Sequence, residues 1–136
     1  MSDEASYELL GFDNVLLPVG DLREAVAFYQ RAGFTVAFRF DEAGIALLKV
    51  GGETPGILLR AEEGLGPRPP LWPSPHVWLE VPNARAALRE LTAAGITPLD
   101  EVFPVATGWT VEIADPWGNV LGFTDYTKRP ELARRG

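Results

Sequence analysis

Leucine and valine recur at every second position in two short stretches of the chain, residues 15–19 and 77–81. A period of two is typical of a strand with one face in the core, so both stretches are predicted to be strands. Each is followed by apolar residues at helical spacing, over residues 22–29 and 84–91. The pattern therefore predicts two units in which a strand leads into a helix.

The same residue types bound both predicted helices. Asp21 and Asn83 stand where an N-cap side chain would accept a hydrogen bond from the first turn, and Gly33 and Gly95 stand where each helix would end. The two units also align with each other without a gap, at an offset of 62 residues. Repetition this regular indicates a duplicated unit.

Three further strands are predicted after each helix, which makes each unit a βαβββ module. They span Thr35–Phe40, Ile45–Val50 and Gly56–Ala61, and then Leu99–Phe103, Trp109–Ala114 and Val120–Tyr126. The expected fold class is α+β, with two tandem modules in a single domain over residues 1–136. Its parts are module one at about residues 9–62, a Pro- and Gly-rich linker at about 63–75, module two at about 76–127 and a polar tail at 128–136.

The composition limits the cellular compartments and the binding partners that can be expected. The chain contains no cysteine, so nothing indicates an oxidising compartment. Its formal net charge is −7, and this charge disfavours binding to nucleic acid because phosphate binding relies on lysine and arginine. The first residues are polar and acidic, and neither a secretion signal nor a membrane span is evident. We expect a cytoplasmic protein that binds neither nucleic acid nor membranes. We interpret the basic cluster Lys128, Arg129, Arg134 and Arg135 as a solvated tail.

A turn over residues 115–119, Asp-Pro-Trp-Gly-Asn, adds a specific motif to the duplicated module. Together with the runs Asp21-Leu22, Phe28-Tyr29 and Gly33-Phe34, it resembles the vicinal oxygen chelate superfamily over about residues 9–127. That family includes glyoxalase I, extradiol dioxygenases, fosfomycin-modifying enzymes and bleomycin-binding resistance proteins. The resemblance implies paired modules that form a curved, mixed sheet around a cleft, with the helices on the outer face and often in a homodimer.

The resemblance also implies where a divalent metal would bind. Enzymes of the family commonly use one side chain on the first and one on the last strand of each module, and those positions fall on Asn14, Leu58, His76 and Gly122. Leucine and glycine side chains offer no donor atom, and a divalent ion needs three or more nitrogen or oxygen ligands. We therefore expect neither a metal ion nor another cofactor.

Strand alternation predicts which side chains face the cleft instead of the helices. The expected ligand-binding residues on the strands are Asn14, Leu16, Leu58, Arg60, His76, Trp78, Glu80, Thr110 and Glu112. Tryptophan offers a large flat face for stacking on aromatic ligands, so Trp109 and Trp117 are added as ligand contacts, and with Trp72 they could close the rim.

His76 and Glu112 are the candidates for catalysis. His76 could accept a proton or orient a ligand, or it could be a former metal ligand that is now hydrogen-bonded to Asn14 or Glu80. Glu80 and Glu112 could form an acid and base pair in an apolar cleft, or they could lie at a hydrated end of the sheet. Arg60 could pair with one of them or with an anionic ligand.

Three functions are compatible with these residues. The first is a metal-free binding protein of the bleomycin-resistance type, which sequesters a hydrophobic or aromatic small molecule. The second is an enzyme of the same fold, either a glyoxalase-like isomerase with an unexpected metal set, a dioxygenase, or a metal-free lyase or isomerase that uses His76 with Glu112. The third is a subunit or interaction domain whose tryptophans are covered by a partner.

Overall fold

Module one is a four-stranded mixed sheet with one helix. The computed structural model describes residues 10, 12–70 and 75–134. The elements of module one are β1 (Val15–Val19), α1 (Leu22–Arg31), β2 (Thr35–Phe40), the 3-10 helix η2 (Asp41–Ala43), β3 (Ile45–Val50) and β4 (Glu53–Ala61). The strand order is β1-β4-β3-β2, with β1 parallel to β4 and the other pairs antiparallel. This order leaves β1 at an edge of the sheet.

Module two repeats this topology. Its elements are β5 (His76–Glu80), α2 (Ala84–Ala93), β6 (Phe103–Pro104), β7 (Trp109–Ala114) and β8 (Val120–Thr124). The strand order is β5-β8-β7-β6, with β5 parallel to β8. Like β1 in module one, β5 lies at an edge of its sheet. A short 3-10 helix, η3 (Pro130–Leu132), follows in the tail. The α+β class and the two tandem modules are confirmed, although the strands form two separate four-stranded sheets instead of one continuous sheet.

The helix boundaries follow the predicted caps. The side chain of Asp21 accepts a hydrogen bond from the Glu24 N–H at 2.8 Å, and that of Asn83 accepts one from the Ala86 N–H at 2.9 Å. Gly33 and Gly95 follow the two helices at φ values of 102° and 85°, in the left-handed region that glycine adopts without strain. The two helices thus begin and end where the sequence predicts.

Three strand predictions need correction, and in one of them β8 ends at Thr124 instead of Tyr126. The strand expected at Leu99–Phe103 is only two residues long, Phe103–Pro104. Prolines at 98 and 104 remove backbone donors at both ends of that segment, so a longer ladder is not available. In contrast, β4 begins three residues earlier than expected, because Gly51 and Gly52 form a tight turn that pairs Val50 with Glu53.

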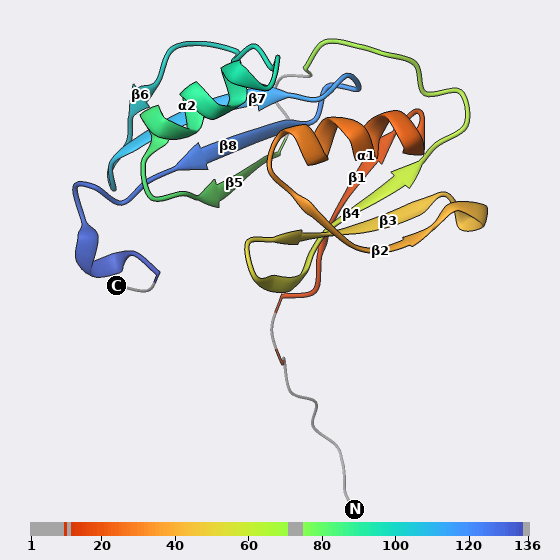
Figure 1. The fold of residues 1–136 in the computed structure, drawn as a ribbon, viewed down its shortest axis with the longest axis horizontal. Coiled ribbons are helices and arrows are strands. Elements are labelled where there is room, and N and C mark those ends of the chain that lie inside the picture. Colours follow the sequence, from red (N-terminus) through yellow and green to blue (C-terminus); the bar gives the residue numbers. More distant parts are fainter. Residues whose placement is uncertain (1–9, 11, 71–74, 135–136) are drawn as a thin grey trace, which may run out of the picture.

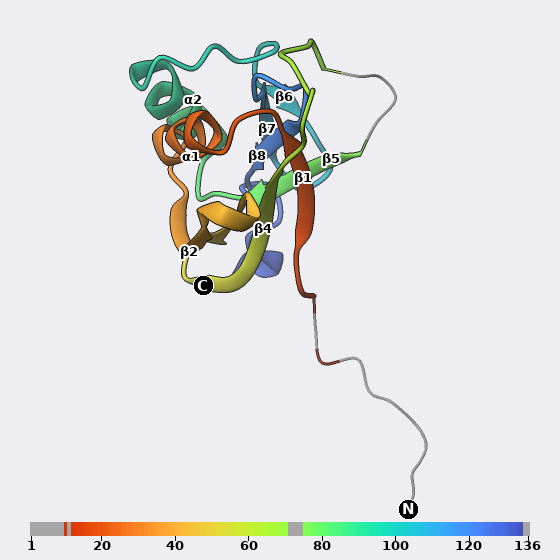
Figure 2. The ribbon, with the colours of Figure 1, turned by 90° about the vertical axis from the view of Figure 1, so that its right-hand side faces the viewer.

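Both helices lie on the same side of the two sheets, next to each other (Figure 1). Figure 2 shows them on one side of the molecule, with β1, β4 and β5 on the other. A single cluster of buried apolar residues contains side chains from both modules, including Leu48, Leu59, Leu91 and Leu121. The modules therefore share one core on the helix side. Within the described residues, no helix is long and apolar enough to cross a membrane.

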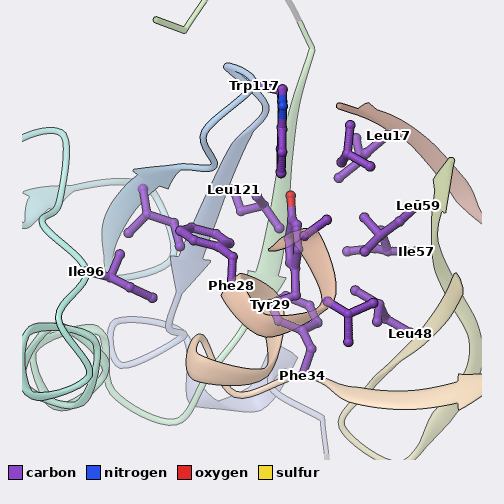
Figure 3. Packing of buried hydrophobic residues seen from close by; sticks show 14 of the residues in the cluster. Leu17, Phe28, Tyr29, Phe34, Leu48, Ile57, Leu59, Ile96, Trp117 and Leu121 are labelled. Carbon is purple, nitrogen blue, oxygen red and sulfur yellow. The ribbon is translucent and has the colours of Figure 1, made fainter. Parts of the chain in front are cut away.

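A buried polar network joins the modules through this core. The Tyr29 hydroxyl of α1 donates to Asp115 Oδ2 at 2.7 Å, and Asn119 Nδ2 donates to the same atom and to the carbonyl of Pro18 in β1. Figure 3 shows Tyr29 between apolar side chains, with Trp117 above its hydroxyl. Burial, followed by the neighbouring Asp115 carboxylate, raises the pKa of Tyr29 well above its ordinary value. The phenol therefore stays protonated and keeps donating, which fixes the position of one module relative to the other.

Candidate ligand-binding site

The candidate site lies on the sheet face of module two that points away from the helices, which we call the open face. Alternation along β5 directs Val77 and Leu79 toward the shared core and Trp78 toward the open face, where it is 45% exposed. Glu112 of β7 reaches the same face, two strands away from β5. Trp78 and Glu112, both predicted to face the cleft, thus lie on the same face of the sheet.

His76, Trp78 and Glu112 form a hydrogen-bonded group that we call the His76 cluster. Glu112 Oε2 lies 2.8 Å from His76 Nδ1 and accepts a hydrogen bond from Trp78 Nε1 at 2.7 Å. In the tautomer with the proton on Nδ1, His76 donates to this carboxylate, which can only accept when ionised. The side chains of His76 and Glu112 are 16% and 15% exposed. Glu112 thus fixes the orientation of both the imidazole and the indole.

Gly122 explains why the indole can reach Glu112. In the strand register, Trp78 of β5 lies beside Gly122 of β8, and Gly122 lies beside Glu112 of β7. A Cβ atom added at Gly122 would lie 2.5 Å from Trp78 Cδ1 and 2.7 Å from Nε1. The ring of Trp78 therefore occupies the space that a side chain at position 122 would fill.

A cavity of about 510 Å³ opens beside this cluster, between the edge strands β1 and β5 of the two modules. His76, Trp78 and Glu80 line it from module two, together with Val77 and Leu79. The residues that line it from module one and the tail are Phe12, Val15, Val50, Gly51, Gly52, Glu53, Gly56, Ile57 and Arg134. A volume in this range suits a drug-sized organic molecule.

One end of the cavity carries charged groups from both modules. Glu80 Oε1 accepts from Arg134 Nη1 at 2.8 Å, and Glu80 Oε2 accepts from the backbone N–H of Arg134 at 2.9 Å. Arg134 Nε donates to Glu53 Oε2 at 3.0 Å. Hydrogen bonds to Glu80 and then to Glu53 raise the pKa of Arg134 above its ordinary value. The Arg134 side chain is solvent-exposed, as expected of a solvated tail, and its guanidinium also contacts carboxylates of both modules.

The predicted ligand residues of module one lie outside this cavity. Leu16 and Leu58 are neighbours across β1 and β4, on the open face of the first sheet. Arg60 pairs with Glu62 at 2.7 Å, neither with Glu80 nor with Glu112. Asn14 Nδ2 donates to Asp13. The structure thus brings His76, Trp78 and Glu80 to the cavity, with Glu112 behind them, but separates them from these module-one residues.

Two predicted contacts from module two, Thr110 and Trp109, also lie away from the cavity. Thr110 is fully buried, and its hydroxyl lies 2.9 Å from that of Thr124. Trp109 lies on the helix side, where Arg85 of α2 and Lys128 stack on its ring at 4.4 and 4.9 Å. Alternation explains this, since Trp109 shares a face with the buried Val111 and not with Glu112.

Trp117 belongs to the core and not to the rim of the cavity. It is 2% exposed, and its backbone N–H donates to Asp115 Oδ1 at 2.9 Å, which folds the turn back over the core. Gly20 makes room for it, because a Cβ atom there would collide with the indole. Trp72, the third tryptophan suggested for the rim, lies outside the described residues.

The module-one wall of the cavity was missed by sequence reasoning. It is formed by Val15 and Ile57 at the start of the β1 and β4 pair and by the turn at Gly51 and Gly52. The pair of glycines was the available signal, since it predicts a tight turn. Nothing in the sequence indicates that this turn lies beside β5.

The donor set does not fit the metal centre that the family resemblance implies. Of the four expected positions, Leu58 and Gly122 supply no donor, and the space at Gly122 holds the Trp78 ring. Within the part of the chain that the structure describes, no three His, Cys, Asp or Glu side chains are grouped to hold a metal ion. Asn14 and His76 alone would leave a divalent ion short of protein ligands.

Comparisons with known proteins agree with this fold. The model of the Glyoxalase/Bleomycin resistance protein/Dioxygenase superfamily matches residues 11–123. No curated protein is similar enough in sequence to count as a match. A glyoxalase/bleomycin resistance protein/dioxygenase from Alicyclobacillus acidocaldarius is similar at a TM-score of 0.70 and 18% identity, covering 91% of this chain and 97% of its own.

Two other solved structures carry functional names. A lactoylglutathione lyase from Agrobacterium tumefaciens is similar at a TM-score of 0.65 and 18% identity, with 88% of this chain and 96% of the other covered. The genomically encoded fosfomycin resistance protein FosX from Listeria monocytogenes is similar at 0.70 and 15%, with 92% and 100% covered. At these identities the likeness concerns the fold alone.

Proposed function

The chain belongs to the glyoxalase/bleomycin resistance protein/dioxygenase superfamily, and we propose that it binds a hydrophobic or aromatic small molecule in the cavity between its modules without a metal ion. The position of Trp78 is the observation that carries this proposal. Its ring fills the space over Gly122, at a position where the family commonly has a metal-binding glutamate, and it lines the cavity. An aromatic surface thus stands in place of a coordinating group.

The cavity has the mixture of surfaces that an aromatic ligand needs. Trp78 is fixed through its indole N–H by Glu112, so a stacking ligand would not have to immobilise a mobile ring. Val15, Ile57 and Leu79 supply apolar contacts on the other walls. His76 lines the same cavity with its ring, which Glu112 holds through Nδ1.

The open face of module one supports a homodimer as part of the same proposal. Leu16, Phe38 and Phe40 are 40%, 51% and 47% exposed, and large exposed apolar side chains in a group are typical of an interface. A second copy would cover this face in the cytoplasm. Sedimentation velocity tests the proposal: a monomer at micromolar concentration would contradict it.

An enzyme of the same fold is the alternative, and the His76 and Glu112 pair favours it. A carboxylate that holds an imidazole at 2.8 Å is the arrangement that orients a general base. The pair would suit removal of a proton next to a carbonyl by a metal-free lyase or isomerase. Turnover of a candidate substrate with a pH profile that His76→Ala abolishes would establish this alternative over simple binding.

The indole N–H resonances of the ¹⁵N-labelled protein test the binding proposal. Trp78→Phe assigns the signal of Trp78, and Trp109→Phe is the matched control because Trp109 lies on the helix side. We expect neutral aromatic probes, 2-naphthol and benzamide, to shift the Trp78 signal in a saturable way in protein treated with EDTA. Saturable shifts confined to Trp109, or none at any probe concentration, would contradict the proposal.

A further inference from the structure

The charged end of the cavity adds a chemical class to the proposed ligand. We propose that Glu53 and Glu80 recognise a cationic group of the ligand, and that Arg134 occupies this position as an internal substitute until the ligand displaces it. The inference rests on the proposed binding function. It predicts that the ligand is an aromatic or apolar molecule with an amidine, guanidine or amine group.

Glu80 belongs to the built part of the site, and Glu53, whose side chain is 62% exposed, lies at its rim. Glu80 lies on β5, two residues after Trp78, and its side chain is only 17% exposed. Glu53 is the first residue of β4 and comes from the other module. Both line the same cavity as Trp78, so one ligand can contact the carboxylates and the indole together. Two carboxylates on separate modules define a cation position at the boundary between them.

The group that now fills this position is a cation from the tail. Arg134 contacts both carboxylates through three hydrogen bonds, and its guanidinium shows the chemistry that the position accepts. Its side chain is 68% exposed and comes from the end of the described chain. The ion pair with Glu53 is exposed on both sides, and such pairs contribute little, so a ligand cation that also stacks on an indole can replace the guanidinium.

The neighbouring charges favour a cation over an anion. The cavity is lined by two carboxylates, Glu53 and Glu80, against the one guanidinium of Arg134, and Glu112 places a third carboxylate against the indole of Trp78. The chain as a whole carries a formal charge of −7. When the tail moves away, the cavity therefore attracts cations and repels anions.

Benzamidinium and benzamide provide a matched pair of probes, since they have the same ring and nearly the same shape but differ in charge. Arg134→Gln removes the internal cation. Arg129→Gln is the control, because Arg129 lies in the same tail, pairs with Glu131 instead and changes the net charge equally. Affinities are read from the Trp78 indole signal at fixed ionic strength.

We expect Arg134→Gln to tighten benzamidinium binding about three- to fivefold and to leave benzamide unchanged. Arg129→Gln should change neither affinity, and adding Glu80→Gln to Arg134→Gln should remove the gain. The cation site would be overturned if Arg134→Gln bound the two probes with equal affinity, or if Arg129→Gln tightened benzamidinium binding as much as Arg134→Gln does. In either case, binding of benzamide would still support the proposed function. Binding of neither probe would overturn both.

Discussion

Substitution Tyr29→Phe tests the polar network that holds the two walls of the cavity in place. It removes a buried hydrogen bond of 2.7 Å to Asp115 and leaves the packing of the ring unchanged. A hydrogen bond to a charged group contributes about 1.5–3 kcal/mol. Since Asp115 keeps the donors from Trp117 and Asn119, no charge is left unpaired, and the loss should stay within this range.

This loss corresponds to a measurable change in melting temperature. For a chain of 136 residues the unfolding entropy near the midpoint is about 0.3 kcal/mol/K, so Tm should fall by about 5–10 °C. Calorimetry at pH 7 gives this value. Tyr126→Phe is the control, because Tyr126 is only half-buried near the tail, and its Tm should change by less than about 2 °C.

The pH dependence separates the hydrogen bond from packing. The pKa of Tyr29 is raised in the folded state, so its contribution to stability is complete below pH 10 and is lost as the pH rises from there toward the folded pKa. Tyr29→Phe lacks this contribution, and the difference in unfolding free energy between the two proteins should narrow above pH 10. A variant as stable as the parent at pH 7, or a difference that is constant from pH 7 to 11, would refute the role of the network.

Two further substitutions test other parts of the account. Asp125→Asn should reduce the unfolding free energy by about 2–4 kcal/mol in urea titrations at pH 7, because this buried carboxylate accepts from the N–H groups of Ala84 and Trp109. Burial raises the pKa of Asp125, but these bonds and those from Thr127 outweigh it and hold the pKa below its ordinary value. The parent should therefore lose stability as the pH falls below 4, and a steeper acid loss in the variant would contradict this. Gly122→Ala should cost about 1–3 kcal/mol and shift the Trp78 indole resonance, because the methyl group meets the ring. Gly66→Ala is the control and should cause neither the loss of stability nor the shift, because there is open space around its Cβ position. An unshifted Trp78 signal in Gly122→Ala would disprove the contact between the methyl group and the ring.

Local signals in the sequence predicted the elements and one face of the site. The caps at Asp21 and Asn83 fixed the helix starts, and period-two alternation placed Trp78 and Glu112 on a common face. These features depend on neighbours along the strand or helix, which the sequence contains directly. The same rule, applied to Trp109, would have placed it beside Val111 on the helix side.

The rest of the site depends on contacts between distant segments. The turn at Gly51 and Gly52 lines the same cavity as β5, and Arg134 forms a hydrogen bond with Glu80. Neither segment has a sequence pattern that indicates these neighbours. Trp117 lies in the core because Asp115 folds the turn inward and Gly20 leaves room for the ring. Such placements follow from the shared core of the two modules and not from periodicity.

Metal binding by the purified protein decides whether the chain functions without a metal ion. Protein prepared without chelators or metal-affinity resin would be analysed by mass spectrometry for metals, then titrated calorimetrically with nickel, zinc, manganese and iron(II). Since Leu58 and Gly122 provide no ligands, we predict metal content far below one ion per chain and no stoichiometric binding. One ion bound per chain, and lost in His76→Ala, would contradict the account.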